Sequence, residues 1–174
     1  MIIISNSSPL IKLSYLSYQN SSYLDFLLKL GKIITTNIVK NEVLKEGKPN
    51  YDILKEFFNK IEVKEVNINE ELQKIINLDE GELSCILLFS ELSKEGKEIL
   101  FLTDDQDAKI FVEKVFNIRV IGTLGLIVEF YKRGFIPKTE AEETIKNIRE
   151  KTRLHVSDDI IQKALELLEN KSPH

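Results

Sequence analysis

The sequence predicts an α/β fold built on a mainly parallel sheet. Apolar runs of strand length alternate along the chain with segments of helical periodicity, as in sheets whose parallel strands are joined by helices. The two clearest strands, residues 2–5 and 99–102, are dominated by continuous apolar residues, which is typical of strands buried on both faces. A chain of 174 residues that is 43% hydrophobic and 30% charged can bury a core of its own. We therefore expect one domain over residues 1–174, with a C-terminal helical extension over about 138–170.

Capping residues, glycines and prolines set the expected ends of these elements. Ser8 is the expected N-cap of a helix whose first residue is Pro9, and Gly31 is expected to stop the second helix. Further helix starts are expected at Thr36 or Asn37, at Asp79, at Thr123, and at Thr139 with Glu142 at capping-box spacing. The expected strands are 2–5, 32–35, 61–66, 99–102 and 118–121, and the expected helices are 10–13, 23–30, 39–44, 51–58, 69–76, 79–93, 110–115, 123–132, one from 139 and 158–168.

Composition narrows the functional classes. The net charge is −4, which excludes a uniformly basic nucleic-acid-binding surface but not a nuclease with an acidic centre and a local basic rim. One cysteine cannot form an internal disulfide or a multi-cysteine metal site, and two histidines leave little room for histidine-based catalysis. No apolar run approaches the roughly 18 residues needed to cross a bilayer, and no signal segment is visible. We therefore expect a cytoplasmic protein with no membrane association.

Polar residues follow the two clearest strands. Asn6, Ser7 and Ser8 follow the first strand, and residues 103–107 (Thr-Asp-Asp-Gln-Asp) follow the strand at 99–102. In open α/β sheets, ligands bind outside the carboxyl ends of the strands where the strand order reverses. If these two strands are neighbours at such a point, their polar clusters face each other over one crevice. Two further acids near helix starts, Glu42 and Glu82, are candidates for the same crevice.

Several carboxylates in one crevice require protonation or a cation. Two carboxylates about 4 Å apart repel by roughly 4 kcal/mol at an effective dielectric constant near 20. Oxygen ligands suit Mg²⁺ or Mn²⁺, which bridge to substrate phosphates and activate a water molecule. An acid cluster, a divalent ion and phosphodiester hydrolysis therefore form one consistent interpretation.

Each acid also has an explanation that involves no catalysis. Asp104 can cap the helix that follows it, with Asp107 at the N3 position, and Asp79 with Glu82 fits a capping box. Only the joint pattern, acids after one strand together with acids at helix starts, favours a functional site. The remaining candidates have similar explanations, Glu42 as a solvated helix residue and Asn6 as a polar turn residue.

Four segments resemble motifs of PIN domains, and they occur in the family's order. Residues 2–11 (IIISNSSPLI) resemble the opening strand and helix start, where the family has Asp followed by Thr or Ser. Residues 78–84 (LDEGELS) resemble the helix start Asp-x-Gly-Glu-Ala, and residues 102–109 (LTDDQDAK) resemble Leu-Thr-Asp-Asp-x-x-Ala-Arg. Residues 120–125 (VIGTLG) resemble a segment of the PIN subfamily DUF3368, which is found mainly in archaea and bacteria. The resemblance covers nearly the whole chain.

This resemblance implies a three-layer α/β/α PIN fold and a Mg²⁺- or Mn²⁺-dependent ribonuclease that acts on RNA. Many PIN domains are toxins of type II toxin–antitoxin pairs, and PIN relatives often dimerise, so an antitoxin protein and a homodimer are implied partners. By motif position, the implied metal ligands are Asn6, Glu42, Glu82, Asp104, Asp105 and Asp107. The implied catalytic residues are Glu42, Glu82, Asp105 and Asp107, supported by Ser7, Ser8 and Thr103.

Asn6 is the departure from the family pattern, because most active members have Asp at this position. An amide oxygen can ligate a metal but brings no charge. The alternative interpretation is therefore a catalytically degenerate PIN domain that acts as an RNA- or protein-binding module.

Other chemistries have less support in the sequence. A phosphotransfer receiver domain, a HAD-type phosphatase and a dinucleotide-binding domain need acids or a Gly-rich motif after the first strand, where residues 6–8 are Asn-Ser-Ser. Cys85 is surrounded by apolar residues and is expected to be an inert buried thiol, and His155 is expected at the surface. Basic residues crowd the C-terminal half. Most are expected on solvated helix faces, and some could rim the crevice and contact RNA phosphates: Lys109, Lys114, Arg119, Lys132, Arg133, Lys138, Lys146, Arg149, Lys151 and Arg153.

Overall fold

A five-stranded sheet is the centre of the molecule. The computed structural model describes residues 1–69, 78–94 and 96–170, and within them every neighbouring pair of strands in this sheet is parallel. The α/β class expected from the sequence is confirmed, and the main sheet is wholly parallel rather than mainly so. In spatial order the strands are β5 (Glu62–Lys64), β4 (Lys32–Thr36), β1 (Ile2–Ser5), β6 (Ile99–Leu102) and β7 (Val120–Ile121).

The strand order reverses between β1 and β6. From β1 the chain moves outward through β4 to β5, and it then returns to add β6 and β7 on the other side. Ile4 lies opposite Ile34 of β4 and opposite Phe101 of β6. The pairing continues past the end of β1, where the Asn6 N–H donates to the Leu102 carbonyl at 3.1 Å. The two clearest strands are therefore neighbours, which was the condition for a shared crevice, and their carboxyl ends meet where such sheets bind ligands.

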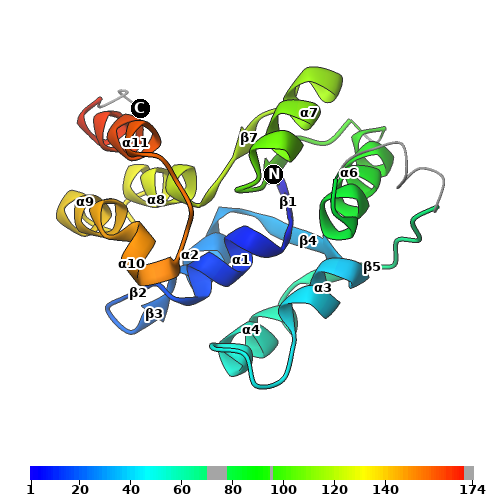
Figure 1. The fold of residues 1–174 in the computed structure, drawn as a ribbon, viewed down its shortest axis with the longest axis horizontal. Helices are drawn as coiled ribbons and strands as arrows, with labels where there is room; N and C mark the ends of the chain where they lie inside the picture. The colour runs from blue at the N-terminus through cyan, green and yellow to red at the C-terminus, as the bar shows by residue number, and fades with distance from the viewer. Residues whose placement is uncertain (70–77, 95, 171–174) are drawn as a thin grey trace.

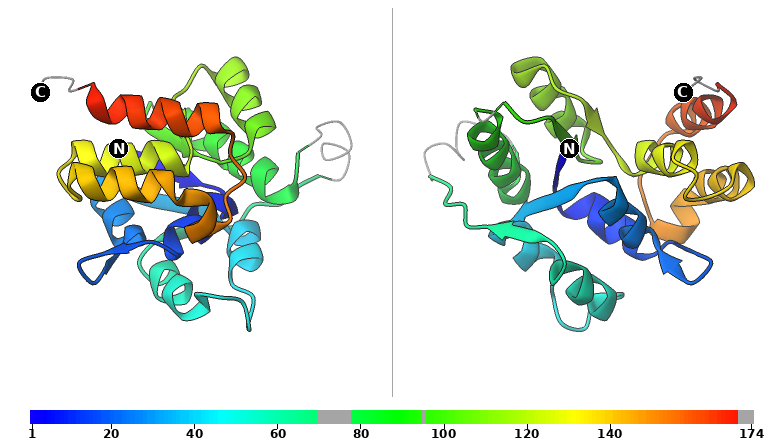
Figure 2. Two further views of the ribbon diagram at one scale, coloured as in Figure 1. Left: turned by 60° about the vertical axis from the view of Figure 1, so that its left-hand side comes forward. Right: turned by 180° about the vertical axis from the view of Figure 1, so that it is seen from behind.

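Helices flank this sheet on both faces, because right-handed crossovers in opposite directions from β1 place their helices on opposite sides (Figure 1). The described helices are α1 (Ser7–Ser14), α2 (Tyr23–Leu30), α3 (Asn37–Val43), α4 (Tyr51–Phe58), α6 (Glu80–Ser93), α7 (Gln106–Phe116), α8 (Thr123–Lys132), α9 (Lys138–Lys146), α10 (Ile148–Thr152) and α11 (Asp158–Glu169). Helix α6 packs against β1 and β4, and α8, α9 and α11 pack on one another. Figure 2 shows α11 lying beside α8 and α9. None of the described helices has both the length and the apolar character needed to span a bilayer.

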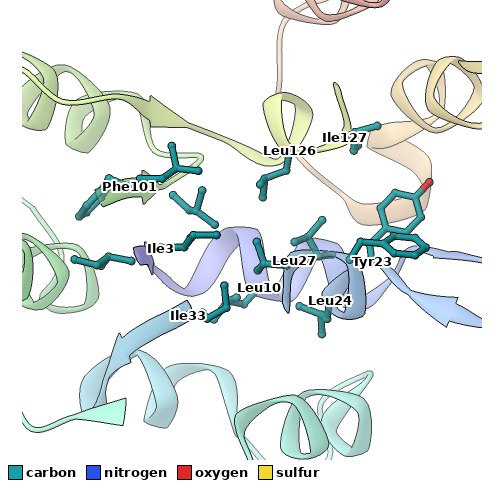
Figure 3. Packing of buried hydrophobic residues seen from close by; sticks show 14 of the residues in the cluster. Ile3, Leu10, Tyr23, Leu24, Leu27, Ile33, Phe101, Leu126 and Ile127 are labelled. Atoms are coloured by element: carbon teal, nitrogen blue, oxygen red, sulfur yellow. The ribbon is translucent and has the colours of Figure 1, made fainter. Parts of the chain in front are cut away.

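The two faces of the sheet bury different sets of side chains. On one face, Ile3 lies toward Leu10 of α1 and Leu126 of α8, as Figure 3 shows. On the other face, Phe101 of β6 meets Phe89 of α6 edge-on, with ring centroids 6.5 Å apart. All five side chains are buried. The strands are therefore covered on both sides, which is why the sequence shows continuous apolar runs at β1 and β6.

Tyr23 joins the C-terminal helices to the core. Its ring is fully buried in the aromatic cluster around Phe130, and its hydroxyl donates to a Glu140 carboxylate oxygen at 3.0 Å. The hydroxyl also lies 3.3 Å from that of Thr144. Burial raises the pKa of Tyr23 well above its ordinary value, so the hydroxyl stays protonated and can donate.

Two local predictions of helix ends are confirmed. Helix α2 has the expected bounds, with a Ser22 capping box before it and Gly31 at its C-cap. Thr36 caps α3 by accepting the Val39 N–H at 3.2 Å. Each of these depends on residues within four positions of the helix end, so sequence spacing is sufficient to find them.

Two helices begin earlier than predicted, α1 by two positions and α8 by one. Ser8 was expected to be an N-cap, but α1 begins at Ser7, and the Ser8 hydroxyl donates instead to Asp104 at 2.9 Å. Thr123 was also expected to be an N-cap, but it is the first residue of α8, and its N–H and hydroxyl both donate to Asp104. The Asp104 carboxylate thus accepts hydrogen bonds from the first turns of both α1 and α8.

The predicted capping box of Thr139 and Glu142 is wrong. Helix α9 begins at Lys138 after Pro137, and Lys138 forms ion pairs with Glu142 at 3.6 Å and with Glu169 at 2.6 Å. The Glu142 carboxylate is therefore directed to a lysine side chain.

Three other segments differ from the predictions. The strand expected at 118–121 is limited to Val120 and Ile121. A small antiparallel hairpin, β2 (Ser17–Tyr18) with β3 (Ser21–Ser22), was not predicted, and the two residues between its strands both have positive φ, as type I′ turns require. Helix α10 was also not predicted, and the helix expected over 69–76 lies outside the described residues from position 70 onward.

Candidate functional site

Asn6 is the centre of the site and carries an unpaired oxygen. It follows β1 directly, is only 3% exposed, and donates from Nδ2 to the Thr103 hydroxyl oxygen at 2.8 Å. Within the described part of the chain, its Oδ1 is buried and has no hydrogen-bond partner. An unpaired buried acceptor is costly, so this oxygen is suited to a cation or a donor from a ligand.

A layer of satisfied polar groups lies beneath Asn6. The carbonyl of Ser5 accepts the Thr35 hydroxyl at 2.7 Å and the Cys85 thiol at 3.4 Å. Cys85 is fully buried, as expected, and burial raises its thiol pKa, which keeps the sulfur protonated and unreactive. The Ser5 carbonyl is thus satisfied by two donors, and the thiol near the site is chemically inert.

Thr103 connects Asn6 to Asp105. Its hydroxyl oxygen accepts the Asp105 N–H at 3.1 Å in addition to the Asn6 amide. Asp105 is the N-cap of α7, where its Oδ1 accepts the Ala108 N–H at 2.8 Å. The Asp105 side chain is exposed, so the carboxylate is anchored through one oxygen and accessible at the mouth of the site.

Glu82 has the most strongly shifted pKa among the candidate acids. It is 7% exposed and belongs to a capping box at the start of α6: its N–H donates to Asp79 at 2.7 Å, and its carboxylate accepts the Asp79 N–H at 3.3 Å. Burial, reinforced by the negative charges of Asp79, Asp105 and Glu42, raises its pKa from 4.5 to about 7. The capping-box explanation is confirmed. The same carboxyl group also interacts electrostatically with Asp105.

Glu42 reaches the same helix start from α3. A Cβ on Gly81 would lie 2.6 Å and 2.7 Å from the two carboxylate oxygens of Glu42, so the carboxylate rests on the backbone of α6. Burial raises the pKa of Glu42, and a hydrogen bond from the Ser7 side chain partly offsets this effect. The glutamate is half-buried rather than fully solvated, and the Ser7 side chain hydrogen-bonds to it. The supporting role of Ser7 toward the residue that follows β1 stays a prediction.

Asp104 is held by three donors. Its carboxylate accepts the Ser8 hydroxyl at 2.9 Å, the Thr123 N–H at 2.6 Å and the Thr123 hydroxyl at 2.8 Å. The prediction that Asp104 caps the next helix is wrong, because Asp105 occupies that position. These contacts give Asp104 a structural role, joining the starts of α1 and α8 to the end of β6. Its role as a metal ligand stays a prediction.

Asp107 lies apart from this network. It is exposed on the first turn of α7, where a negative side chain also favours the helix dipole. It follows Asp105 by two positions in the sequence. Its catalytic and metal-binding roles stay predictions.

The donor chemistry of the site fits a hard divalent cation. Among residues 1–69, 78–94 and 96–170, no group of three His, Cys, Asp or Glu side chains is already arranged to hold a metal ion. The unpaired Asn6 Oδ1 and the carboxylates of Glu82, Asp105 and Glu42 are nevertheless all oxygen ligands, which Mg²⁺ and Mn²⁺ prefer. A cation would satisfy the unpaired oxygen of Asn6 and would offset both the burial and the repulsion that raise the pKa of Glu82.

Sequence reasoning missed the role of Gly81. The residue was visible as a glycine in the first turn of a helix, where it is unfavourable unless another group approaches the backbone closely. That signal indicated a close neighbour but could not identify Glu42 as the neighbour.

Comparison with known proteins adds one result. Residues 2–170 match the protein family described as DUF3368, PIN domain. Searches of curated proteins and of solved structures found no match to the chain.

Proposed function

The chain belongs to the DUF3368 family of PIN domains, and on this premise we propose that it is a metal-dependent endoribonuclease. PIN domains typically bind divalent metal ions, and many are nucleases. The observation that carries the proposal is the buried, unpaired Oδ1 of Asn6, a residue that Thr103 links to Asp105 at the neighbouring strand end. The raised pKa of Glu82, to which the charge of Asp105 contributes, agrees with it. Uncompensated negative charge around a buried acceptor is the environment expected of a cation site.

In this proposal the metal is held by Asn6, Glu42, Glu82 and Asp105, with support from Asp107. A bound Mg²⁺ or Mn²⁺ would supply an activated water and shield the phosphate charge. Thr103 positions two of the ligands at once, because its hydroxyl oxygen accepts from both Asn6 and Asp105. Ser7 orients Glu42, and the buried side of the site keeps bulk water away from the Asn6 amide. The substrate would be single-stranded RNA.

A degenerate domain that binds RNA or protein without cleavage is the second candidate. Two observations favour it: Asn6 contributes no charge, and the acids of the described residues are not prearranged around a metal. The toxin role in a type II toxin–antitoxin pair, its antitoxin partner and a homodimer stay predictions.

The test is cleavage of a labelled, structure-poor RNA by the purified chain with Mg²⁺, with Mn²⁺ and with EDTA. Asp105→Asn is the informative variant, because asparagine also caps helices well and removes only the charge. Asp52→Asn, at an exposed position in the first turn of α4, is the matched control. The proposal predicts metal-dependent cleavage that is lost in Asp105→Asn and kept in the control.

Equal cleavage by both variants would refute the proposed site. No cleavage with either metal by the folded protein would favour the degenerate domain. In that case Asn6→Asp is the next variant, since it restores the carboxylate found in most active relatives.

A further inference from the structure

A hollow lined by α10 and by the segment that follows it lies outside the acid site. Its volume is about 600 Å³, and it is lined by Arg149, Arg153, Leu154, His155 and Val156. Two arginines and a histidine thus line one hollow on the surface of a chain whose net charge is −4. Arginine side chains that line one hollow favour an anionic ligand.

The backbone presents two of these side chains outward together. The segment after α10 has no helical or strand structure, and within it Leu154 is buried at 7% exposure while Arg153 and His155 are exposed. The Leu154 N–H donates to the Thr152 hydroxyl oxygen at 3.2 Å, which fixes the segment to the end of α10. The buried leucine therefore anchors the segment, and its two flanking side chains remain in solvent.

Arg149 shapes the hollow, whereas Arg153 is available to a ligand. The guanidinium of Arg149 pairs with Asp158 at 2.7 Å and donates from Nε to the Val156 carbonyl at 2.9 Å. Within the described residues, the Arg153 guanidinium has no acidic or hydrogen-bonding partner, and neither has the His155 ring. An unpaired guanidinium offers the planar fork that binds phosphate oxygens in pairs.

Helix α1 connects this hollow to the acid site. Lys12 donates from Nζ to the Arg153 carbonyl at 3.4 Å, and four residues earlier Ser8 donates to Asp104 at the end of β6. Residues four apart lie on the same face of a helix, about 6 Å from each other. The segment that lines the hollow is therefore separated from Ser8, at the edge of the acid site, by about one helical turn and the length of a lysine side chain. Figure 1 shows the segment between α10 and α11 passing beside α1.

We propose that Lys12, Arg153 and His155 form a phosphate-binding subsite for the RNA strand whose scissile phosphate occupies the acid site. This inference rests on the proposed function and extends it by naming where the flanking backbone binds. The acids around Asn6 repel a polyanion, so the strand must gain its affinity from cations nearby. Phosphate contacts of this kind hold the strand in position without reading its bases.

The experiment measures the Kd of a labelled single-stranded RNA in EDTA, across a series of salt concentrations, so that cleavage does not enter. Arg153→Gln is compared with Lys163→Gln, which makes the same charge change at an exposed position of α11. We expect Arg153→Gln to raise the Kd about threefold to tenfold and to lower the salt slope by about 0.7, as for one lost phosphate contact to a single strand. Lys163→Gln should leave both values unchanged. Lys12→Gln provides a second, independent variant in case Arg153→Gln perturbs the fold, which circular dichroism would show.

Equal Kd values and slopes for Arg153→Gln, Lys12→Gln and Lys163→Gln would overturn the subsite, as would a wild-type chain that binds no RNA. The result is separable from the nuclease proposal. If RNA binding depends on Arg153 but the chain never cleaves RNA, the subsite is supported and the nuclease proposal fails. If the chain cleaves RNA and Arg153→Gln has no effect on binding, the nuclease proposal is supported and the subsite fails.

Discussion

The carboxylate of Glu42 rests on the backbone of Gly81, so any side chain at position 81 would have to displace it. Both carboxylate oxygens would lie within 2.7 Å of a Cβ placed there. The two residues come from α3 and α6, which pack against each other near the carboxyl ends of β1 and β4. The glycine therefore determines where the glutamate can lie relative to Glu82, one residue further along α6.

Gly81→Ala should lower RNA cleavage without lowering the stability of the fold. Alanine is favoured over glycine in helices by about 1 kcal/mol, and the atoms that it would displace are at the flexible end of Glu42. We expect the free energy of unfolding to stay constant or rise by up to about 1 kcal/mol, while RNA cleavage falls at least tenfold. Denaturant unfolding and a cleavage assay would measure both, with Ser90→Ala in the same helix as the control. Wild-type cleavage by Gly81→Ala would contradict a role for the position of Glu42.

Glu82→Gln should stabilise the metal-free protein at high pH. The folded chain holds the Glu82 proton up to about pH 7, whereas an unfolded chain releases it near pH 4.5. Stability from this group is therefore highest below pH 4.5, falls as the pH rises to 7, and stays low above it. Glutamine avoids that loss, so we expect a gain of about 1–3 kcal/mol at pH 8 that fades toward pH 4.5. Unfolding at several pH values in EDTA would measure it. Glu91→Gln, on the exposed side of α6, should show no such dependence.

Mg²⁺ or Mn²⁺ should stabilise the wild-type chain more at pH 8 than at pH 5.5. An ion that binds the ionised Glu82 must compete with the proton held there, and at pH 5.5 the proton predominates. A ligand at a hundred times its Kd adds about 2.7 kcal/mol to the free energy of unfolding. Thermal melts with and without metal would show a rise in Tm that EDTA reverses. The rise should be lost in Asp105→Asn. An equal rise in that variant at both pH values would place the ion elsewhere.

Asp104→Ala should weaken the fold, unlike Asp105→Asn. The alanine leaves the Ser8 hydroxyl and both Thr123 donors without their acceptor. Each lost hydrogen bond to a charged group costs about 1.5–3 kcal/mol, less where water replaces it, so we expect a total loss of about 2–4 kcal/mol. Chemical denaturation would measure this loss. If Asp104→Ala were as stable as Asp105→Asn, the three bonds would contribute nothing to the fold.

Two kinds of feature could be predicted from the sequence: motifs that depend on local spacing, and strands that are buried on both faces. The strands β1 and β6 were found because burial on both faces leaves a continuous apolar run. The capping box of Asp79 and Glu82 was found because it depends on a spacing of three residues. The placing of Asn6 and Asp105 at neighbouring strand ends followed from the pattern of the sheet, which the structure confirms for β1 and β6.

Only the tertiary structure decided how the acids are used. Asp104 and Asp105 are adjacent in sequence, yet one binds Ser8 and Thr123, 96 and 19 positions away, while the other caps its own helix. No local pattern separates them, because the choice depends on which donors the folded chain brings near each carboxylate. The same holds for Glu42 on Gly81, and for Arg153 near Lys12, which lies 141 positions earlier. The sequence by itself determined the fold class, the family and the set of candidate acids; contacts between distant segments determined which are anchored, which are buried with raised pKa, and which face solvent.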